Sequence, residues 1–175
     1  MHIRPETPAD VAAIDALLVA AFGREGAPRA EADLVLALGA LPGFDPALSL
    51  VAEAEGSVVG YVLFTAVVIE TPGGVEPSLA LAPLATDRAF AGGFAGSALV
   101  REGHRRAAQA GYRSVIVLGD PRYYGRFGFQ PASHWRIRAP WPVPSRAFQA
   151  LELVPGALEE ASGLVRYPAP FDAVS

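Results

Sequence analysis

Apolar residues recur at helical spacing in two segments near the start of the chain. The first run follows Thr7, which begins a capping box that Asp10 completes, with Pro8 suited to the first helical position. It places six apolar residues on one face, which we expect to be buried: Val11, Ile14, Leu17, Leu18, Ala21 and Phe22. The same spacing predicts a second helix over about residues 30–41, which ends before Pro42.

Alternating or continuous apolar runs predict strands in the rest of the chain. After a short strand at Ile3 and Arg4, the strand candidates are residues 48–54, 58–70, 78–85, 114–118, 135–138, 149–153 and 164–167. Glu55 and Gly56 predict a tight hairpin turn between the first two of these runs. Pro83 interrupts hydrogen bonding in the run at 78–85, which implies an edge, a bulge or a splayed position.

A helix over about residues 96–110 is expected between the strands at 78–85 and 114–118. A crossover of that length favours a parallel strand pair, whereas the earlier strands form an antiparallel meander. We therefore expect an α/β (α+β) fold with a mixed, mainly antiparallel central sheet and helices on both faces. No repeat or linker interrupts the pattern, so we expect one domain over residues 1–175.

The composition of the chain limits which partners and chemistries it can have. Of the 175 residues, 51% are hydrophobic, enough for a substantial core. The net charge of −4 argues against nucleic acid, which needs a basic face. The absence of cysteine excludes disulfides and thiolate chemistry, and the three histidines lie too far apart in sequence to suggest a metal site.

No segment has the character of a membrane span. The apolar run at residues 16–22 is far shorter than the roughly 18 residues that a span needs. Acidic residues precede this run, which is unlike the basic start of a signal peptide. We therefore expect no membrane partner and a cytoplasmic location.

The stretch at residues 118–129 concentrates aromatic residues and glycines directly after a buried strand. Ligands of open α/β sheets bind at such strand ends. Tyr124 is the candidate for chemistry, although a core tyrosine bonded to a backbone carbonyl is the alternative. Tyr123 is better suited to packing or to the wall of a ligand site.

Two motifs resemble the GNAT superfamily of acetyl-CoA-dependent N-acetyltransferases. One is the run at residues 81–85, followed by a glycine-bearing loop and the helix at Ser97, and the other is the Tyr-Tyr-Gly-Arg-Phe-Gly-Phe run at 123–129. The segment from Phe148 onward is similar to a bacterial branch of predicted N-acetyltransferases. The resemblance covers nearly the whole chain. It implies acetyl-CoA as co-substrate, a primary amine of a small molecule or peptide as acceptor, and splayed fourth and fifth strands.

The resemblance also implies roles for particular residues. Tyr124 would be the general acid that protonates the departing thiolate, and Tyr123 would contact the co-substrate. Backbone groups of a strand end and of the following loop would hold pantetheine and pyrophosphate: Leu84, Ala85, Thr86, Ala91, Gly92, Gly93, Ala95, Gly96 and Ser97. Glu31 and His134 would line the acceptor site, although a surface carboxylate and a packing pair with Trp135 are the alternatives.

The loop departs from the family pattern at two positions. Ala91 stands where the family has a polar residue, and Phe94 stands where it has glycine. A second hypothesis is therefore a degenerate GNAT module that binds a ligand or protein partner without acyl transfer. The sequence does not choose a general base among Glu70, Glu76 and Asp87. Sheets of this kind often pair through their C-terminal strands, so a homodimer is compatible with the sequence.

Overall fold

A computed structural model describes residues 1–174 of the chain as two compact units. The first comprises Met1–Phe64, Pro83–Arg106 and the described part of Ala169–Ser175, and the second comprises Thr65–Ala82 and Ala107–Pro168. Two long strands and one helix contribute residues to both units. The expectation of one domain over residues 1–175 stays a prediction, and each unit is described by itself.

The first unit begins with an antiparallel meander, as predicted. Strand β1 (His2–Pro5) pairs with β2 (Ser49–Ala54), and β2 pairs with the first part of β3 (Ser57–Thr71). Glu55 and Gly56 have φ values of 51° and 77°, which are the positive values that a tight hairpin turn requires. The predicted hairpin is therefore confirmed.

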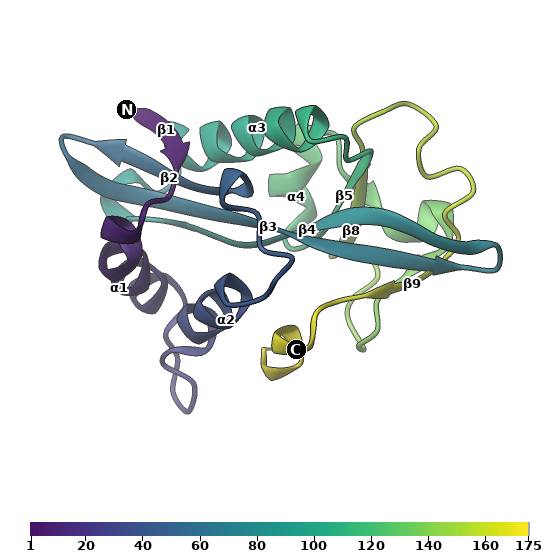
Figure 1. The fold of residues 1–175 in the computed structure, drawn as a ribbon, viewed down its shortest axis with the longest axis horizontal. Coiled ribbons are helices and arrows are strands. Elements are labelled where there is room, and N and C mark those ends of the chain that lie inside the picture. Colours follow the sequence, from purple (N-terminus) through teal and green to yellow (C-terminus); the bar gives the residue numbers. More distant parts are fainter. Residues whose placement is uncertain (175) are drawn as a thin grey trace. The chain divides into compact units, whose positions relative to one another are not determined.

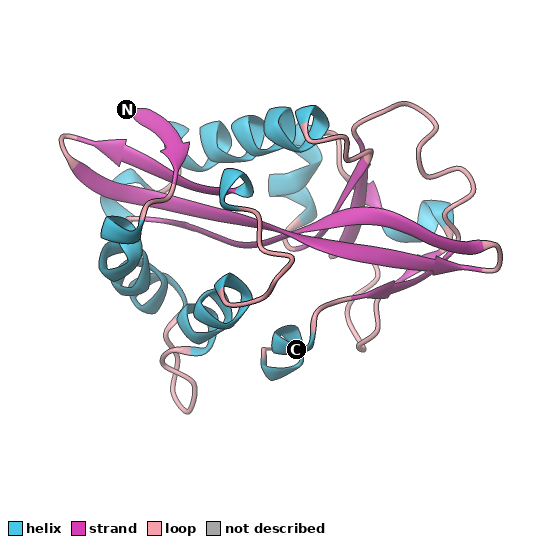
Figure 2. Cartoon of the chain, in the orientation of Figure 1, coloured by secondary structure: helices cyan, strands magenta, loops and turns pink. Residues whose placement is uncertain are grey.

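Helices α1 (Val11–Phe22) and α2 (Ala30–Gly39) lie on one side of these strands, and α3 (Phe94–Gln109) lies on the other (Figures 1 and 2). The capping box is present, with the Thr7 backbone N–H donating to Asp10 Oδ2 at 2.7 Å. The predicted buried face of α1 is too wide, because Val11 and Ala21 are exposed at its margins. Its core residues are Ile14, Leu17 and Leu18.

In the first unit, α3 packs very closely on β3, and two glycines permit this. A Cβ on Gly103 would collide with the ring of Phe64, and one on Gly60 would lie 2.9 Å from Cδ1 of Leu99. Phe64 and Leu99 are both almost fully buried. This close contact holds the middle of α3 against the sheet.

The second unit contains the predicted parallel pair. Strand β4 (Gly74–Thr86) pairs in parallel with β5 (Ser114–Leu118), and α3 is the crossover. The ladder runs from Leu79 opposite Val115 to Leu81 opposite Val117, although β4 continues to Thr86. The ladder therefore ends at Leu81, two residues before Pro83, where hydrogen bonding was predicted to be interrupted.

The remaining strands complete a mixed, mainly antiparallel arrangement. β8 (Phe148–Glu152) is antiparallel to β5 and to β6 (Gln130–Pro131). β9 (Gly163–Arg166) is antiparallel to the second part of β3 and parallel to β7 (Ile137–Arg138). The predicted fold class is confirmed.

Three local predictions were wrong in extent. The strand expected at residues 135–138 is shorter and comprises only β7, because Trp135 ends a 3₁₀ turn over Ala132–Trp135 and Arg136 adopts a left-handed φ of 56°. Helix α3 begins at Phe94, two residues earlier than expected, and β4 begins at Gly74. Within residues 1–174, no helix combines the length and apolar character that crossing a bilayer requires.

Candidate active site

The stretch after β5 is a short helix, which the sequence suggested only as a turn. Helix α4 (Pro121–Tyr124) follows Asp120, whose Oδ1 accepts a hydrogen bond from the Arg122 backbone N–H at 2.8 Å. Pro121 occupies the first helical turn, and Gly128, with φ of 95°, ends the 3₁₀ turn after α4. A capping carboxylate, a proline and a glycine thus place Tyr124 just beyond the end of the strand.

The ring of Tyr124 packs directly on the backbone of Gly119. A Cβ on Gly119 would lie 2.9 Å from Cδ2 of Tyr124 and would collide with Cε2. The Gly119 backbone is itself fixed, because its N–H donates to Ala147 O at 2.9 Å and its carbonyl accepts from Gln149 Nε2 at 3.2 Å. The ring of Tyr124 also meets that of Phe129 edge to face, with centroids 5.6 Å apart. The orientation of Tyr124 is therefore determined from both sides.

The environment of Tyr124 keeps its phenol protonated. Burial, with a smaller contribution from Tyr123, raises the pKa of the Tyr124 phenol well above its ordinary value near 10. Within residues 1–174, no group is found that hydrogen-bonds the Tyr124 hydroxyl. No bond from Tyr124 to a backbone carbonyl is thus found among residues 1–174, and its catalytic role stays a prediction.

Tyr123 belongs to a cluster of aromatic and cationic groups. Its ring meets that of Tyr124 edge to face at 4.9 Å and that of Phe127 at 5.5 Å. The guanidinium carbon of Arg126 lies 4.5 Å from the Tyr123 ring centroid, which is a cation–π distance. Tyr123 thus packs against Tyr124, and its contact with the co-substrate stays a prediction.

In the first unit, the loop between β4 and α3 exposes backbone and small residues. Asp87 fixes its start, with its N–H donating to Val59 O at 2.8 Å and its carboxylate accepting from Ala89 N at 2.8 Å. Ala91, Gly92 and Gly93 are exposed, and Gly92 has φ of 73°. The N–H groups of the first helical turn have no partner within the helix, and the helix dipole favours an anion there.

The other predicted loop residues lie at the strand end and in the first turn of α3. Ala85 is buried and Leu84 and Thr86 are half-buried at the end of β4. Ala95, Gly96 and Ser97 were expected in or at the edge of the loop, but they are buried in the helix. Only their backbone groups are therefore candidates for ligand contacts.

Phe94 is exposed at the start of α3. Its side chain is 70% exposed, so the ring is directed to solvent instead of packing across the backbone. Ala91, with φ of −64° and ψ of 140°, is extended and also exposed. The loop residues thus remain exposed despite the two departures from the family pattern, and exposed N–H groups before a helix fit a phosphate group.

The two residues predicted for the acceptor site have different surroundings. Glu31, on α2, accepts from Arg24 Nη1 at 3.1 Å. His134 is exposed, and its ring meets that of Trp135 edge to face at 4.8 Å. The structure thus includes the packing pair that was the alternative for His134, and it places an ion pair at Glu31.

The three carboxylates considered as general bases all have structural partners. Glu70 pairs with Arg166 at 2.7 Å, Glu76 lies 3.7 Å from Arg113, and Asp87 caps the turn that begins the β4–α3 loop. None of them has the buried, unpaired character that tunes a carboxylate for proton abstraction. Residues 1–174 also contain no cluster of acidic residues and histidines that would hold a metal ion.

Comparison with known proteins decides the family. No protein-family model matches the chain. The chain is 41% identical over 173 residues to the uncharacterized N-acetyltransferase YhbS of Escherichia coli K12, an alignment that covers 98% of this chain and 99% of YhbS. This chain belongs to the GNAT family of N-acetyltransferases.

Solved GNAT structures agree with this assignment. The crystal structure of Escherichia coli YhbS in complex with CoA superposes with a TM-score of 0.87 at 40% identity, and covers 98% of this chain and 91% of that one. A GNAT acetyltransferase of Brucella melitensis in complex with acetyl-CoA gives a TM-score of 0.78 at 35% identity, and covers 98% and 97%. The predicted family and fold are therefore confirmed, and the chain is an N-acetyltransferase.

Sequence reasoning missed the residues that support Tyr124. Gly119, Gln149 and Arg126 lie within or near the motifs, but their side chains carry no reactive group. The signal for Gly119 was a glycine at a strand end, five positions before an aromatic residue. Glycine at such a place often marks a close approach of another group to the backbone.

Proposed function

We propose that this GNAT enzyme transfers the acetyl group of acetyl-CoA to a primary amine of a small molecule or peptide. The observation that carries the proposal is Tyr124, which is oriented by Gly119 and has a phenol pKa raised by burial. The CoA in YhbS and the acetyl-CoA in the Brucella relative support the same co-substrate here.

The co-substrate is assigned to backbone groups of the first unit. In this proposal the strand end at Leu84, Ala85 and Thr86 binds the pantetheine arm as an added strand would. The exposed backbone from Ala91 to Gly93 and the first turn of α3 bind the pyrophosphate, which the helix dipole favours. The accessible backbone of the loop and the outward position of Phe94 support this assignment.

Tyr124 is assigned the role of general acid. The amine nitrogen forms a bond to the thioester carbonyl carbon, the carbon–sulfur bond breaks, and the sulfur takes the proton of the Tyr124 hydroxyl. The nitrogen releases one proton to solvent as the amide forms, and solvent returns one to the phenolate. Because the three candidate carboxylates are held by structural partners, no general base is assigned, and a protonated acceptor loses its proton to solvent before it attacks as the neutral amine. General-acid catalysis of this kind contributes about 10²–10⁴-fold to the rate.

The acceptor site is assigned to Glu31 and His134. The net charge of −4 favours the approach of cationic molecules, as protonated amines are. Glu31 would contact the acceptor from α2, while its pairing with Arg24 fixes the carboxylate. A homodimer and a cytoplasmic location stay predictions of the sequence.

The departures at Ala91 and Phe94 motivate the competing function, a degenerate module that binds without acyl transfer. Calorimetric titration with acetyl-CoA, followed by acetylation of a panel of amines monitored by mass spectrometry, separates the two functions. We expect acetyl-CoA to bind and to raise the free energy of unfolding by about 2.7 kcal/mol at a hundredfold excess over Kd. No binding at millimolar acetyl-CoA would rule out the enzymatic proposal, and binding without acetylation of any amine would favour the degenerate module.

A further inference from the structure

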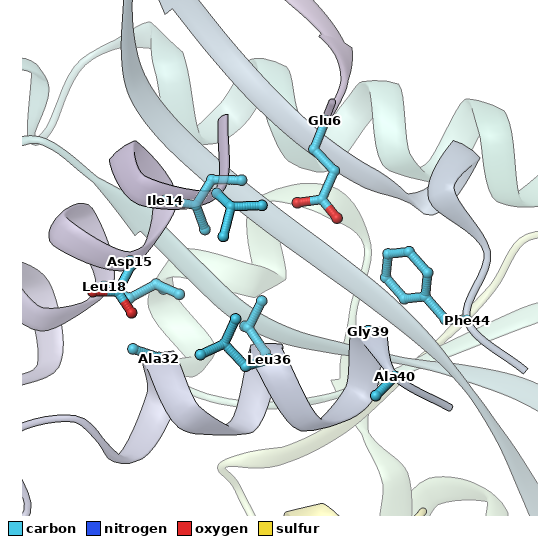
Figure 3. A pocket seen from close by; sticks show the side chains of 11 residues that line it. Glu6, Ile14, Asp15, Leu18, Ala32, Leu36, Gly39, Ala40 and Phe44 are labelled. Carbon is cyan, nitrogen blue, oxygen red and sulfur yellow. The ribbon is translucent and has the colours of Figure 1, made fainter. Parts of the chain in front are cut away.

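A cavity of about 360 Å³ lies between α1 and α2 in the first unit (Figure 3). This volume is near the lower end of the roughly 300–1,000 Å³ that is common for small-molecule sites. Its walls are mostly apolar, and they come from the first two turns of α1, from α2 and from the chain after α2: Val11, Ile14, Leu18, Ala32, Val35, Leu36, Gly39, Ala40 and Phe44. The carboxylates of Glu6 and Asp15 complete the lining.

Glu6 directs a carboxylate into this apolar space. Its backbone follows β1 and is held by an N–H bond to Ser49 O at 2.9 Å. In Figure 3 the carboxylate points inward, with Ile14 and Phe44 on either side. Burial raises the pKa of Glu6, the negative charge of Asp10 raises it further, and a hydrogen bond from Ser49 opposes both effects. The carboxylate is therefore partly desolvated and lacks a full counter-charge.

The arginine side chains near the cavity form ion pairs with carboxylates other than that of Glu6. Arg4 binds Asp10 through both terminal nitrogens, at 2.7 and 2.9 Å. Arg29 binds Asp15 in the same way, at 2.6 and 3.1 Å. Within the described chain, residues 1–174, no ion pair to Glu6 is found. Glu6 is thus the carboxylate of the cavity whose charge this chain leaves uncompensated.

We propose that the cavity between α1 and α2 binds a small organic cation, an ammonium with an apolar body, and that Glu6 is its counter-ion. A half-buried carboxylate is costly unless a cation pairs with it, and an ammonium inside the cavity removes that cost. Ile14, Leu18 and Val35 supply the contact for the apolar body, and the ring of Phe44 adds a face that attracts a cation. A small anion is disfavoured because Glu6, Asp10 and Asp15 all lie on or beside this cavity.

This site needs none of the residues proposed for acetyl transfer, so it is tested apart from that reaction. The probes are phenethylammonium, its neutral analogue 2-phenylethanol and the anion 3-phenylpropanoate, each titrated by calorimetry without acetyl-CoA. We expect the ammonium to bind at least about tenfold more tightly than the alcohol, because a hydrogen bond to a charged group contributes that much or more. The anion should not bind. The N,N-dimethyl form of the amine, which cannot form a stable amide, should retain the affinity.

Two variants locate the site. Glu6→Gln keeps the size of the side chain and should lower the ammonium affinity about tenfold while leaving the alcohol unchanged. Glu25→Gln, at an exposed position of the α1–α2 loop, is the matched control and should change neither. Gly39→Leu places a side chain where a Cβ meets nothing within 4 Å, so it should weaken the ammonium and the alcohol alike by partly filling the cavity.

Equal affinity of the ammonium and the alcohol, or an unchanged ammonium affinity in Glu6→Gln, would overturn the role of Glu6. Failure of all three probes to bind at millimolar concentration would overturn the site itself. Thermal unfolding of each variant is measured alongside, so that loss of binding is counted only for folded protein. If added acetyl-CoA leads to acetylation of bound phenethylammonium and Glu6→Gln slows it, the cavity serves the acceptor. If the amine stays unmodified but still binds, the cavity serves a separate ligand.

Discussion

The loop before α3 and the turn after β5 are both assigned to acetyl-CoA, but they are built in opposite ways. The turn works through a side chain, because Tyr124 is held on Gly119 and against the ring of Phe129. The loop offers backbone, since Ala91, Gly92 and Gly93 are exposed and the ring of Phe94 is directed to solvent. Side-chain identity therefore matters at the turn, whereas φ and accessibility matter at the loop.

This difference explains why the two motifs look unequally well preserved in the sequence. Substituting the catalytic residue removes a general acid directly. Substituting a loop residue displaces a backbone N–H only if it changes the backbone conformation. Ala91 and Phe94 are changes of the second kind that leave the backbone accessible. Mutations that disturb the packing of the Tyr124 ring on Gly119 should therefore lower turnover. Mutations that disturb the backbone of the loop should weaken the binding of acetyl-CoA.

Apart from the loss of the Tyr124 hydroxyl itself, the largest effect is expected for Gly119→Ala. The added Cβ collides with the Tyr124 ring and displaces the hydroxyl, and a displacement of about 1 Å costs roughly 10²-fold in rate. The measurement is kcat and Kd for acetyl-CoA, and Kd should change little. Gly125→Ala is the control, because a Cβ there meets nothing within 4 Å and φ is negative. Equal kcat in the two variants would mean that the packing of the Tyr124 ring on Gly119 is unimportant for turnover.

Gly92→Ala should affect binding instead. Alanine disfavours the observed φ of 73° by about 1–2 kcal/mol, so the loop relaxes and its amides move. We expect Kd for acetyl-CoA to rise about five- to tenfold, with kcat at saturation retained. Gly73→Ala, in the β3–β4 turn, has neither a positive φ nor a neighbour for the Cβ and should leave Kd unchanged. If Gly92→Ala binds like the wild type, the backbone of this loop is not the binding element.

Phe94→Ala should have a much smaller effect. The side chain is 70% exposed, and surface substitutions usually change free energies by less than about 0.5 kcal/mol. We expect Kd for acetyl-CoA to stay within about twofold of the wild-type value, as measured by calorimetry. A tenfold gain in affinity would show that the ring obstructs the site, and the contrast between loop and turn would then be wrong.

Turnover should not fall through deprotonation of Tyr124 up to about pH 9.5. A raised pKa favours the protonated phenol, so Tyr124 keeps its proton below and somewhat above its ordinary pKa near 10. Wild-type kcat at saturating acceptor should therefore not decline between pH 7 and 9.5. A decline centred below pH 9 that is absent from Tyr124→Phe would show that the phenol titrates early and that burial does not protect it.

Periodicity and turn chemistry in the sequence predicted the regular elements of the fold. The meander, the hairpin at Glu55 and Gly56, and the parallel β4–α3–β5 unit are all confirmed. The 3₁₀ turn at Ala132–Trp135 was not predicted, because the left-handed conformation of Arg136 has no signal in its residue type. The exposure of Val11 was not predicted either. The spacing of apolar residues on α1 does not show how much of that face is covered by the rest of the protein.

At the candidate site, the sequence identified Tyr124 by its motif but not the residues that hold it. A contact between Gly119 and an aromatic ring five positions later depends on the geometry of α4, which residue types alone do not specify. The sequence also placed Phe94 in the loop, because the residue types did not show where α3 begins. The start of the helix at Phe94, two residues before the predicted one, changed that interpretation.

The most direct test of the account is the turnover of Tyr124→Phe, which removes only the hydroxyl. With Kd for acetyl-CoA measured on the same preparation, we expect kcat to fall about 10²–10⁴-fold and Kd to stay unchanged. Tyr112→Phe, which also removes a single hydroxyl from the second unit, should behave as the wild type. Unchanged kcat in Tyr124→Phe would contradict the central claim that this tyrosine protonates the departing thiolate.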